Sequence, residues 1–236
     1  MATDYLERGA LAGVAGGLVY GLFVATVGNA FTAGLETFEH GHGGGGPVVS
    51  DLTTTVASVG GGVLWGLLFG VAAFGMAYFF LEPAIPGTGA AKRLALAGAG
   101  FLTVSGTPWL VLPPQPPGVE QALGTETRLA WYAGLMGLGA LVAVLAGLAY
   151  QRTEGRHTAV QLGAAALPLV LLAVPVALAP ANPVHGEVPV ALVAAYRWTV
   201  VFGQLLLWAT IAGVHAWLGD GETRATDDLE YPATAD

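Results

Sequence analysis

Cysteine is absent from the 236-residue chain. Its absence excludes disulfides, thiolate zinc sites, iron–sulfur clusters and cysteine nucleophiles. A metal site here must therefore use nitrogen and oxygen ligands. The sequence also lacks a His-Glu-x-x-His pair and a phosphate-binding loop followed by lysine. We therefore expect no enzyme, no use of ATP by this chain and no tightly bound cofactor. A membrane enzyme would need a polar cavity that holds a serine–histidine or carboxylate pair.

Charge is also scarce, because only 10% of the residues are charged and 54% are hydrophobic. A soluble domain averages about 25% charged residues. The mean hydropathy is +0.65, and apolar runs of roughly 20 residues, the length that crosses about 30 Å of hydrocarbon, recur along the chain. The composition therefore indicates an integral membrane protein.

Basic residues are outnumbered by acidic ones, 8 against 16, and the net charge is −8. This balance argues against nucleic acid as a partner. It is typical of proteins from a salt-adapted source, such as a haloarchaeon. The first residues lack the basic front and early cleavage site of a signal peptide, so we expect the first apolar run to be a retained helix.

The apolar runs predict an all-α fold, a polytopic membrane helix bundle of about six transmembrane helices over residues 1–218. Residues 219–236 are acidic and poor in apolar residues, so we expect a disordered C-terminal tail. Ser105, Gly106 and Pro108 interrupt the third run, which fits either a broken helix at a binding cavity or a simple proline kink. The six runs are expected near residues 10–35, 56–81, 94–112, 128–150, 160–178 and 192–218.

Glycines recur at spacing four in the first two runs, a pattern that lets two membrane helices approach closely. We expect these two helices to pack backbone to backbone. The stripes are Gly13, Gly17 and Gly21, and Gly62, Gly66 and Gly70.

Six spans place both termini on one side of the membrane, and most of the lysine and arginine residues share that side. The positive-inside rule makes it the cytoplasm. Only Arg128 and Arg197 begin helices on the other side. We therefore expect a multi-pass plasma-membrane protein with both termini cytoplasmic. The cytoplasmic cations would be Arg8, Lys92, Arg93, Arg152, Arg156 and Arg224.

Potential metal ligands gather on the opposite, outward side. Glu36, Glu39 and His40 have the spacing i, i+3, i+4, which puts them on one helix face, and His42 follows. Later in the chain, His185 and Glu187 would join them from another outward loop. Imidazole and carboxylate suit borderline divalent metals. The alternatives are a solvated helix end with a flexible loop and, for His185, a loop histidine bonded to backbone.

Residues in the second half carry a resemblance to a known family. Glu187-Val-Pro followed by Arg197, Gln204 and Leu207-Trp208, together with Pro113 to Val119 and then Arg128 and Tyr132, resembles the CbtA family of predicted cobalt transporter subunits. The resemblance covers about residues 8–218. It implies about five spans, cobalt as cargo and a small single-span histidine-rich partner, CbtB.

We therefore expect a membrane subunit of a divalent metal uptake transporter, with cobalt as the suspected ion. The alternative is a membrane scaffold or assembly protein that transports nothing. Partners would be membrane lipid, the divalent metal ion, the CbtB-like subunit and a second copy in a homo-oligomer. We expect Arg197 to pair with Glu187 or Glu120 in a structural role. His215, near the inner end of the last span, is either an exit ligand or an interfacial histidine.

Overall fold

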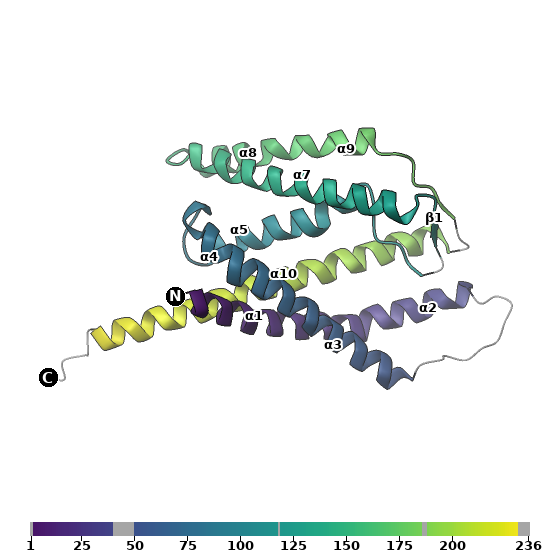
Figure 1. Ribbon diagram of the computed structural model, residues 1–236, viewed down its shortest axis with the longest axis horizontal. Helices are drawn as coiled ribbons and strands as arrows, with labels where there is room; N and C mark the ends of the chain where they lie inside the picture. Colours follow the sequence, from purple (N-terminus) through teal and green to yellow (C-terminus); the bar gives the residue numbers. More distant parts are fainter. Residues whose placement is uncertain (1, 40–49, 118, 186–187, 231–236) are drawn as a thin grey trace.

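The computed structural model describes residues 2–39, 50–117, 119–185 and 188–230. They form helices, with one antiparallel pairing of two-residue strands (Figure 1). The all-α fold predicted from the sequence is confirmed. The α-helices are α1 (Ala2–Phe23), α2 (Asn29–Glu39), α3 (Asp51–Phe69), α4 (Tyr78–Leu81), α5 (Ala90–Phe101), α6 (Thr107–Trp109), α7 (Thr125–Arg152), α8 (Thr158–Ala166), α9 (Ala173–Leu178) and α10 (Val190–Glu230). The strands are β1 (Glu120–Gln121) and β2 (Val184–His185).

Most of the shorter helices continue one another through turns of different pitch. Wider π-helical turns join α1 to α2, α3 to α4 and α5 to α6, and a 3₁₀ segment begun by Pro168 joins α8 to α9. The joining turns are Val24–Gly28, Gly70–Ala77, Leu102–Gly106 and Leu167–Leu172, and a further 3₁₀ turn, Glu82–Ala84, follows α4.

The start of α1 and the last part of α10 lie at the same end of the bundle, which we call the terminus end (Figure 1). A Cβ built on Gly219 would lie 2.5 Å from Arg93 Nη2 and 3.1 Å from Arg8 Nη1, so α1, α5 and α10 meet there. At the same end, Gln151 Nε2 donates to the carbonyl oxygen of Ala84 over 2.7 Å, which ties the last turn of α7 to the turn after α4.

The opposite end, which we call the loop end, contains β1, β2 and the last turn of α2 (Figure 1). In the strand pair Glu120 faces His185 and Gln121 faces Val184. Asn182 reinforces the pairing, because its Nδ2 donates to Gln121 Oε1 over 3.1 Å. The loops before α7 and before α10 are thereby held together.

Five helical stretches in the described part of the chain are long and apolar enough to cross a membrane, whereas the sequence predicts about six. The third predicted run is not among them, because Lys92 and Arg93 lower its hydropathy. It nevertheless joins the two ends: Lys92 Nζ donates to Glu82 O at the terminus end, and Pro114 O accepts from Arg197 at the loop end. The helical residues 90–109 reach roughly 30 Å at 1.5 Å per residue, enough for one crossing. The five stretches are Ala2–Leu35, Asp51–Ala84, Thr125–Arg152, Thr158–Leu178 and Val190–Asp220.

The interruption predicted in the third run is a π-helical turn, Leu102–Gly106, and α6 continues directly from it. This segment packs on protein. A Cβ at Gly139 of α7 would lie 2.9 Å from Thr103 Cα, and Tyr132 donates to Val104 O over 2.6 Å. The run is therefore a helix of locally altered pitch against which α7 packs closely.

α1 and α3 pack backbone to backbone, as the glycine spacing predicts. A Cβ at Gly17 would lie 2.5 Å from Gly62 O and 2.7 Å from Val63 Cα, and a Cβ at Gly62 would lie 2.5 Å from Gly21 Cα. These contacts are with backbone atoms, which cannot rotate away. The close approach therefore requires glycine on both helices.

The core forms where α10 crosses α1, the π-helical turn after α3, and α5. Phe74, Leu207, Trp208 and Ile211 are all buried in one apolar cluster. The Phe74 and Trp208 rings lie 6.4 Å apart. Trp208 also closes the gap to α5, because a Cβ on Gly100 would overlap its indole ring.

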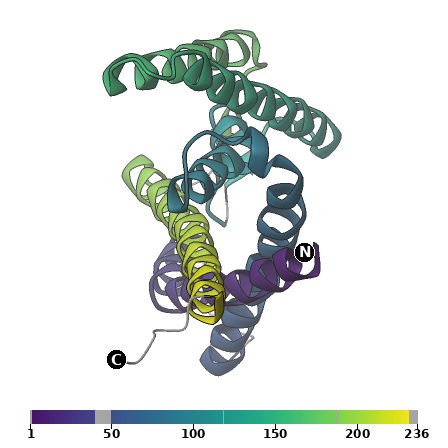
Figure 2. The ribbon, with the colours of Figure 1, turned by 90° about the vertical axis from the view of Figure 1, so that its left-hand side faces the viewer.

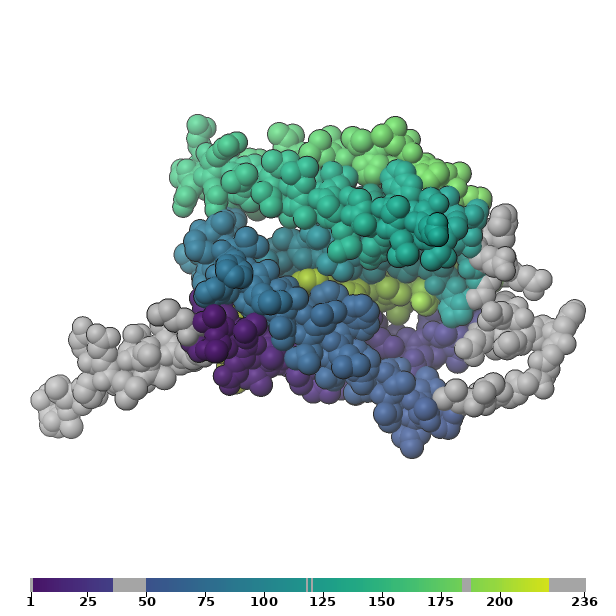
Figure 3. All heavy atoms as spheres, in the orientation of Figure 1, coloured from purple at the N-terminus to yellow at the C-terminus, as the bar shows by residue number. Residues whose placement is uncertain are grey.

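The helices α7, α8 and α9 form a separate layer on one side of this core (Figure 2). The same layer is visible along one side of the space-filling view (Figure 3). In the apolar segment of α7 only 17% of the residues are buried, and in that of the α8–α9 stretch only 6% are. The corresponding share is 28% in the stretches that contain α1 and α3. Apolar side chains that face outward to this extent suit lipid as their surroundings.

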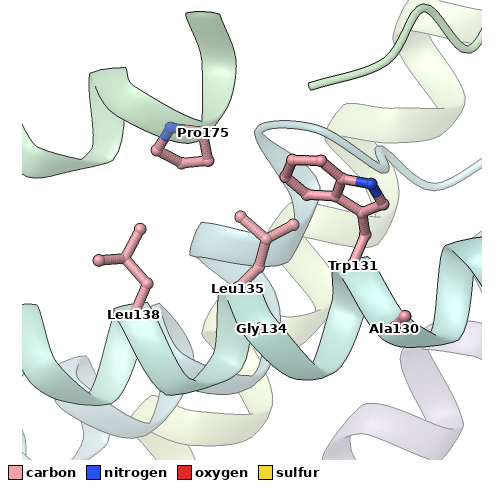
Figure 4. Close-up of a pocket in the computed structure, with 6 residues that line it drawn as sticks. All are labelled: Ala130, Trp131, Gly134, Leu135, Leu138 and Pro175. Carbon is pink, nitrogen blue, oxygen red and sulfur yellow. The ribbon is translucent and has the colours of Figure 1, made fainter. Parts of the chain in front are cut away.

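α7 and α9 leave a cavity of about 340 Å³ between them (Figure 4). Trp131, Leu135 and Leu138 line it from α7, and Pro175 lines it from α9. Its walls are mostly apolar, so it has the character of a lipid-facing groove.

α10 continues as helix beyond the boundary predicted at residue 218, to Glu230. The division of the chain into a bundle, 1–218, and a separate acidic tail, 219–236, stays a prediction.

Candidate functional site

The metal patch predicted from the sequence lies mostly outside the part of the chain that the structure describes. His40, His42 and Glu187 are outside the described residues. Glu36 and Glu39 are in the last turn of α2, where only the backbone is described. The patch therefore stays a prediction.

Two parts of this predicted patch lie at the same end of the bundle. The last turn of α2, with Glu36 and Glu39, and strand β2, with His185, both lie at the loop end (Figure 1). Among the residues that the structure describes, no three His, Asp or Glu side chains are grouped so that they could hold a metal ion.

The β1–β2 pairing brings together the two copies of a loose repeat in the sequence. A proline-rich turn followed by a glutamate precedes both α7 and α10, with Glu120 in one copy and Glu187 in the other. The strands bring these two turns together, since Glu120 is the register partner of His185. The predicted outward loop of His185 is therefore attached to the loop before α7.

Arg197 fastens the first of these turns to α10. Its Nε donates to Pro114 O over 3.3 Å and its Nη2 to Gln115 Oε1 over 3.0 Å. The acceptors found in the described part of the chain are thus uncharged groups of the proline-rich turn, and the carboxylate partner expected from the sequence, Glu187 or Glu120, stays a prediction. A guanidinium has five donors in a fixed fork, so it can hold a turn and a side chain together. These contacts are those of a structural residue, as predicted.

A second polar site, absent from the metal prediction, lies at the terminus end inside the bundle. His215 on α10 is fully buried and Arg93 on α5 is 8% exposed. Arg93 Nε donates to His215 Nδ1 over 3.3 Å, and Arg93 Nη1 lies 4.0 Å from Asp220 Oδ1. We call Arg93 and His215, together with Tyr5, Tyr78 and Glu82, the terminus-end cluster.

The hydrogen bond fixes the chemistry of His215. A neutral imidazole has one donor nitrogen and one acceptor nitrogen, and because Nδ1 accepts from Arg93, Nε2 carries the proton. Nε2 is buried. Its ring packs between Phe74 and Tyr78, with centroid separations of 5.5 Å and 5.2 Å.

The geometry of His215 favours a structural role. Its side chain is buried between helices and does not face the surface of the bundle. A metal ligand needs a free nitrogen lone pair, and the only lone pair of His215 accepts from a guanidinium that repels cations. His215 therefore acts as the acceptor that allows Arg93 to be buried.

Glu82 completes the cluster from the turn after α4. Its carboxylate accepts hydrogen bonds from the hydroxyl groups of Tyr5 and of Tyr78, the latter over 3.1 Å. The spacing i, i+4 of Tyr78 and Glu82 could be read from the sequence. The contact with Tyr5 could not, because 77 positions separate the two residues.

The comparisons with known proteins identify one family. The family described as "probable cobalt transporter subunit (CbtA)" matches residues 2–220. No curated protein and no solved structure matches the chain. The match covers α1 to α9, including the third run and the α8–α9 stretch, and α10 as far as residue 220. This multi-pass membrane protein therefore belongs to the CbtA family of probable cobalt transporter subunits.

Proposed function

We propose that this chain is the membrane-embedded subunit through which a divalent metal ion, with cobalt as the cargo, enters the cell. The observation that carries the proposal is the family match over residues 2–220. The predicted ligands Glu36, Glu39, His40 and His42, with His185 and Glu187, would collect the ion at the loop end. Weak, hydrated binding suits transport, because a site must also release its ion.

The distribution of cations supports the direction of transport. Arg8 and Arg93 meet beside Gly219, Lys92 bonds to the turn after α4, and Arg152 ends α7. All lie at the terminus end. By the positive-inside rule this end faces the cytoplasm, and the loop end, with the predicted ligands, faces outward.

A partner subunit belongs to the same proposal. The family is one of transporter subunits, and we propose a small single-span, histidine-bearing chain as the partner. It would supply imidazole ligands that this chain has in small number, since its histidines total five.

Uptake of radiolabelled cobalt into proteoliposomes tests the proposal, with this chain alone and with the candidate partner. We expect uptake that falls in a His40→Ala, His42→Ala double variant and in Glu36→Gln. His157→Asn is the matched control, because His157 is an exposed histidine just before α8. Its side chain caps this helix by accepting from Ala159 N, and an asparagine can make the same contact. Undiminished uptake in the double variant would show that the collecting patch is wrong. No uptake with or without the partner would favour the scaffold alternative.

A further inference from the structure

A second cavity, of about 400 Å³, opens at the loop end. It lies between the turn that follows α6 and the first turns of α7, and its polar lining comes from Gln115, Gln121, Thr125, Arg128 and Tyr132. Its described lining residues belong to the turn after α6 and to the segment from Gln121 to Tyr132, apart from the predicted metal patch. What it could bind follows from its hydrogen-bonding groups.

Arg128 is the charged group of this cavity. Its Nη2 donates to Thr125 Oγ1 over 3.3 Å. Its Nε is buried and has no hydrogen-bond partner in the described structure. A guanidinium stays charged and can only donate, and a buried donor without an acceptor is costly. Among the described residues, Nε of Arg128 therefore has no oxygen acceptor.

Two amide side chains of the lining, Gln115 and Gln121, each use the oxygen as a hydrogen-bond acceptor. Gln115 Oε1 accepts from Arg197 Nη2, and Gln121 Oε1 accepts from Asn182 Nδ2. With both oxygens occupied, the Nε2 groups of Gln115 and Gln121 remain as donors. Each amide is therefore fixed by a contact behind the cavity wall.

A second positive charge lies behind the same wall. Arg197 is bonded to Pro114 and Gln115, both of which line the cavity. No aspartate or glutamate is among the described lining residues. The charged and amide groups among the described residues are thus donors, an arrangement that repels a metal cation and favours an anion.

We propose that this cavity binds an oxyanion, the phosphate or carboxylate group of a small solute or of a lipid headgroup. The group would accept from Arg128 Nε and from the amide donors. Trp109, Leu112 and Leu129 supply apolar wall for the remainder of the molecule. The proposal does not depend on the transport function, because it concerns residues outside the predicted metal patch.

Thermal unfolding of the purified full chain in a neutral maltoside detergent tests the proposal. Inorganic phosphate, citrate, phosphatidylglycerol and phosphatidylcholine are titrated separately, with chloride keeping the ionic strength constant for the soluble anions, because screening alone changes charged contacts. The variants are Arg128→Gln, Arg128→Lys and Arg152→Gln. Arg152 is the matched control, since it is an exposed arginine at the other end of the same helix.

We expect saturable stabilisation by at least one anionic ligand in the wild type and in Arg152→Gln. Arg128→Gln should weaken that binding at least about tenfold, the effect of losing one charge-assisted hydrogen bond, and Arg128→Lys should restore part of it. Dependence on Arg128 with phosphate or citrate identifies a soluble ligand, and dependence with phosphatidylglycerol but not phosphatidylcholine identifies a lipid.

Equal binding in the Arg128→Gln and Arg152→Gln variants would overturn the proposal. So would binding that appears only after Glu120→Gln, because the chain's own carboxylate would then be the natural acceptor. Elution of each variant from gel filtration as a single species separates loss of binding from loss of folding.

Discussion

Replacing one glycine in the seam between α1 and α3 should destabilise the bundle, whereas replacing its neighbour should not. Gly61 and Gly62 are adjacent in α3, so they share helix, depth and chemistry. A Cβ at Gly62 would lie 2.5 Å from Gly21 Cα and 2.6 Å from Gly17 O, whereas a Cβ at Gly61 would meet nothing within 4 Å. Gly62→Ala and Gly61→Ala are therefore a matched pair that differs only in the seam.

The size of the effect follows from these distances. Carbon atoms in contact prefer about 3.5–4.0 Å, so the new methyl group would force the two backbones apart by roughly 1 Å. Overpacking of this kind costs about 1–3 kcal/mol. Both variants gain the same helix propensity, up to about 1 kcal/mol for alanine over glycine. Their difference should therefore be about 1–3 kcal/mol, with Gly62→Ala the less stable.

Unfolding of the two purified variants in the same detergent, by denaturant titration or by heat, measures this difference directly. The wild-type chain provides the reference for the propensity gain that Gly61→Ala should show. Equal stability of the two variants would refute the backbone-to-backbone packing of α1 and α3. An equal loss in both variants relative to the wild type would refute it in the same way, because a Cβ at Gly61 meets nothing within 4 Å.

Three further predictions concern the two ends of the bundle. His215→Leu should lower the free energy of unfolding by about 1–3 kcal/mol, because it removes the acceptor of buried Arg93. Cobalt binding by the folded fraction should stay unchanged. Reduced cobalt affinity in a fully folded variant would instead support His215 as a metal ligand. Arg197→Leu should loosen the turn at Pro114 and Gln115 and lower the yield of folded protein at a cost of about 1–3 kcal/mol; normal folding with lost uptake would contradict its structural role. In this cysteine-free chain, Thr88→Cys should react with membrane-impermeant thiol reagents only from the cytoplasm, and Ala122→Cys should react only from outside. Labelling of both cysteines from one side would show that residues 90–109 do not cross the membrane.

The sequence was sufficient for features that depend on local spacing. Glycines four residues apart can only line one face of a helix, so the stripes at Gly17 and Gly62 could be recognised before their partner was known. The apolar runs marked the crossings for the same reason. The third run was correct in position, but Lys92 and Arg93 near its start made its length in the membrane ambiguous.

Contacts between distant parts of the chain could not be read in this way. α10 is apolar on most of its circumference, so the position of His215 along the helix did not reveal that it points inward to Arg93. The carboxylate partner expected for Arg197 was chosen by charge, and the described contacts of this residue, with uncharged acceptors in a turn 82 and 83 positions away, could not be read from the sequence. Proline-rich turns present free carbonyl groups, and these satisfy a guanidinium without a second buried charge.

The packing of α1, α3, α5 and α10 limits where a cation can cross. Along the α1–α3 seam the backbones are in contact, so no hydrated ion passes between these helices. At the junction of α5 and α10 the guanidinium of Arg93 is buried beside His215. A divalent ion about 5 Å from it would be repelled by roughly 7 kcal/mol at an effective dielectric constant of 20. An ion route has to avoid both places. A partner subunit could supply part of such a route, and we therefore expect faster cobalt uptake by the chain with a partner subunit than by the chain alone.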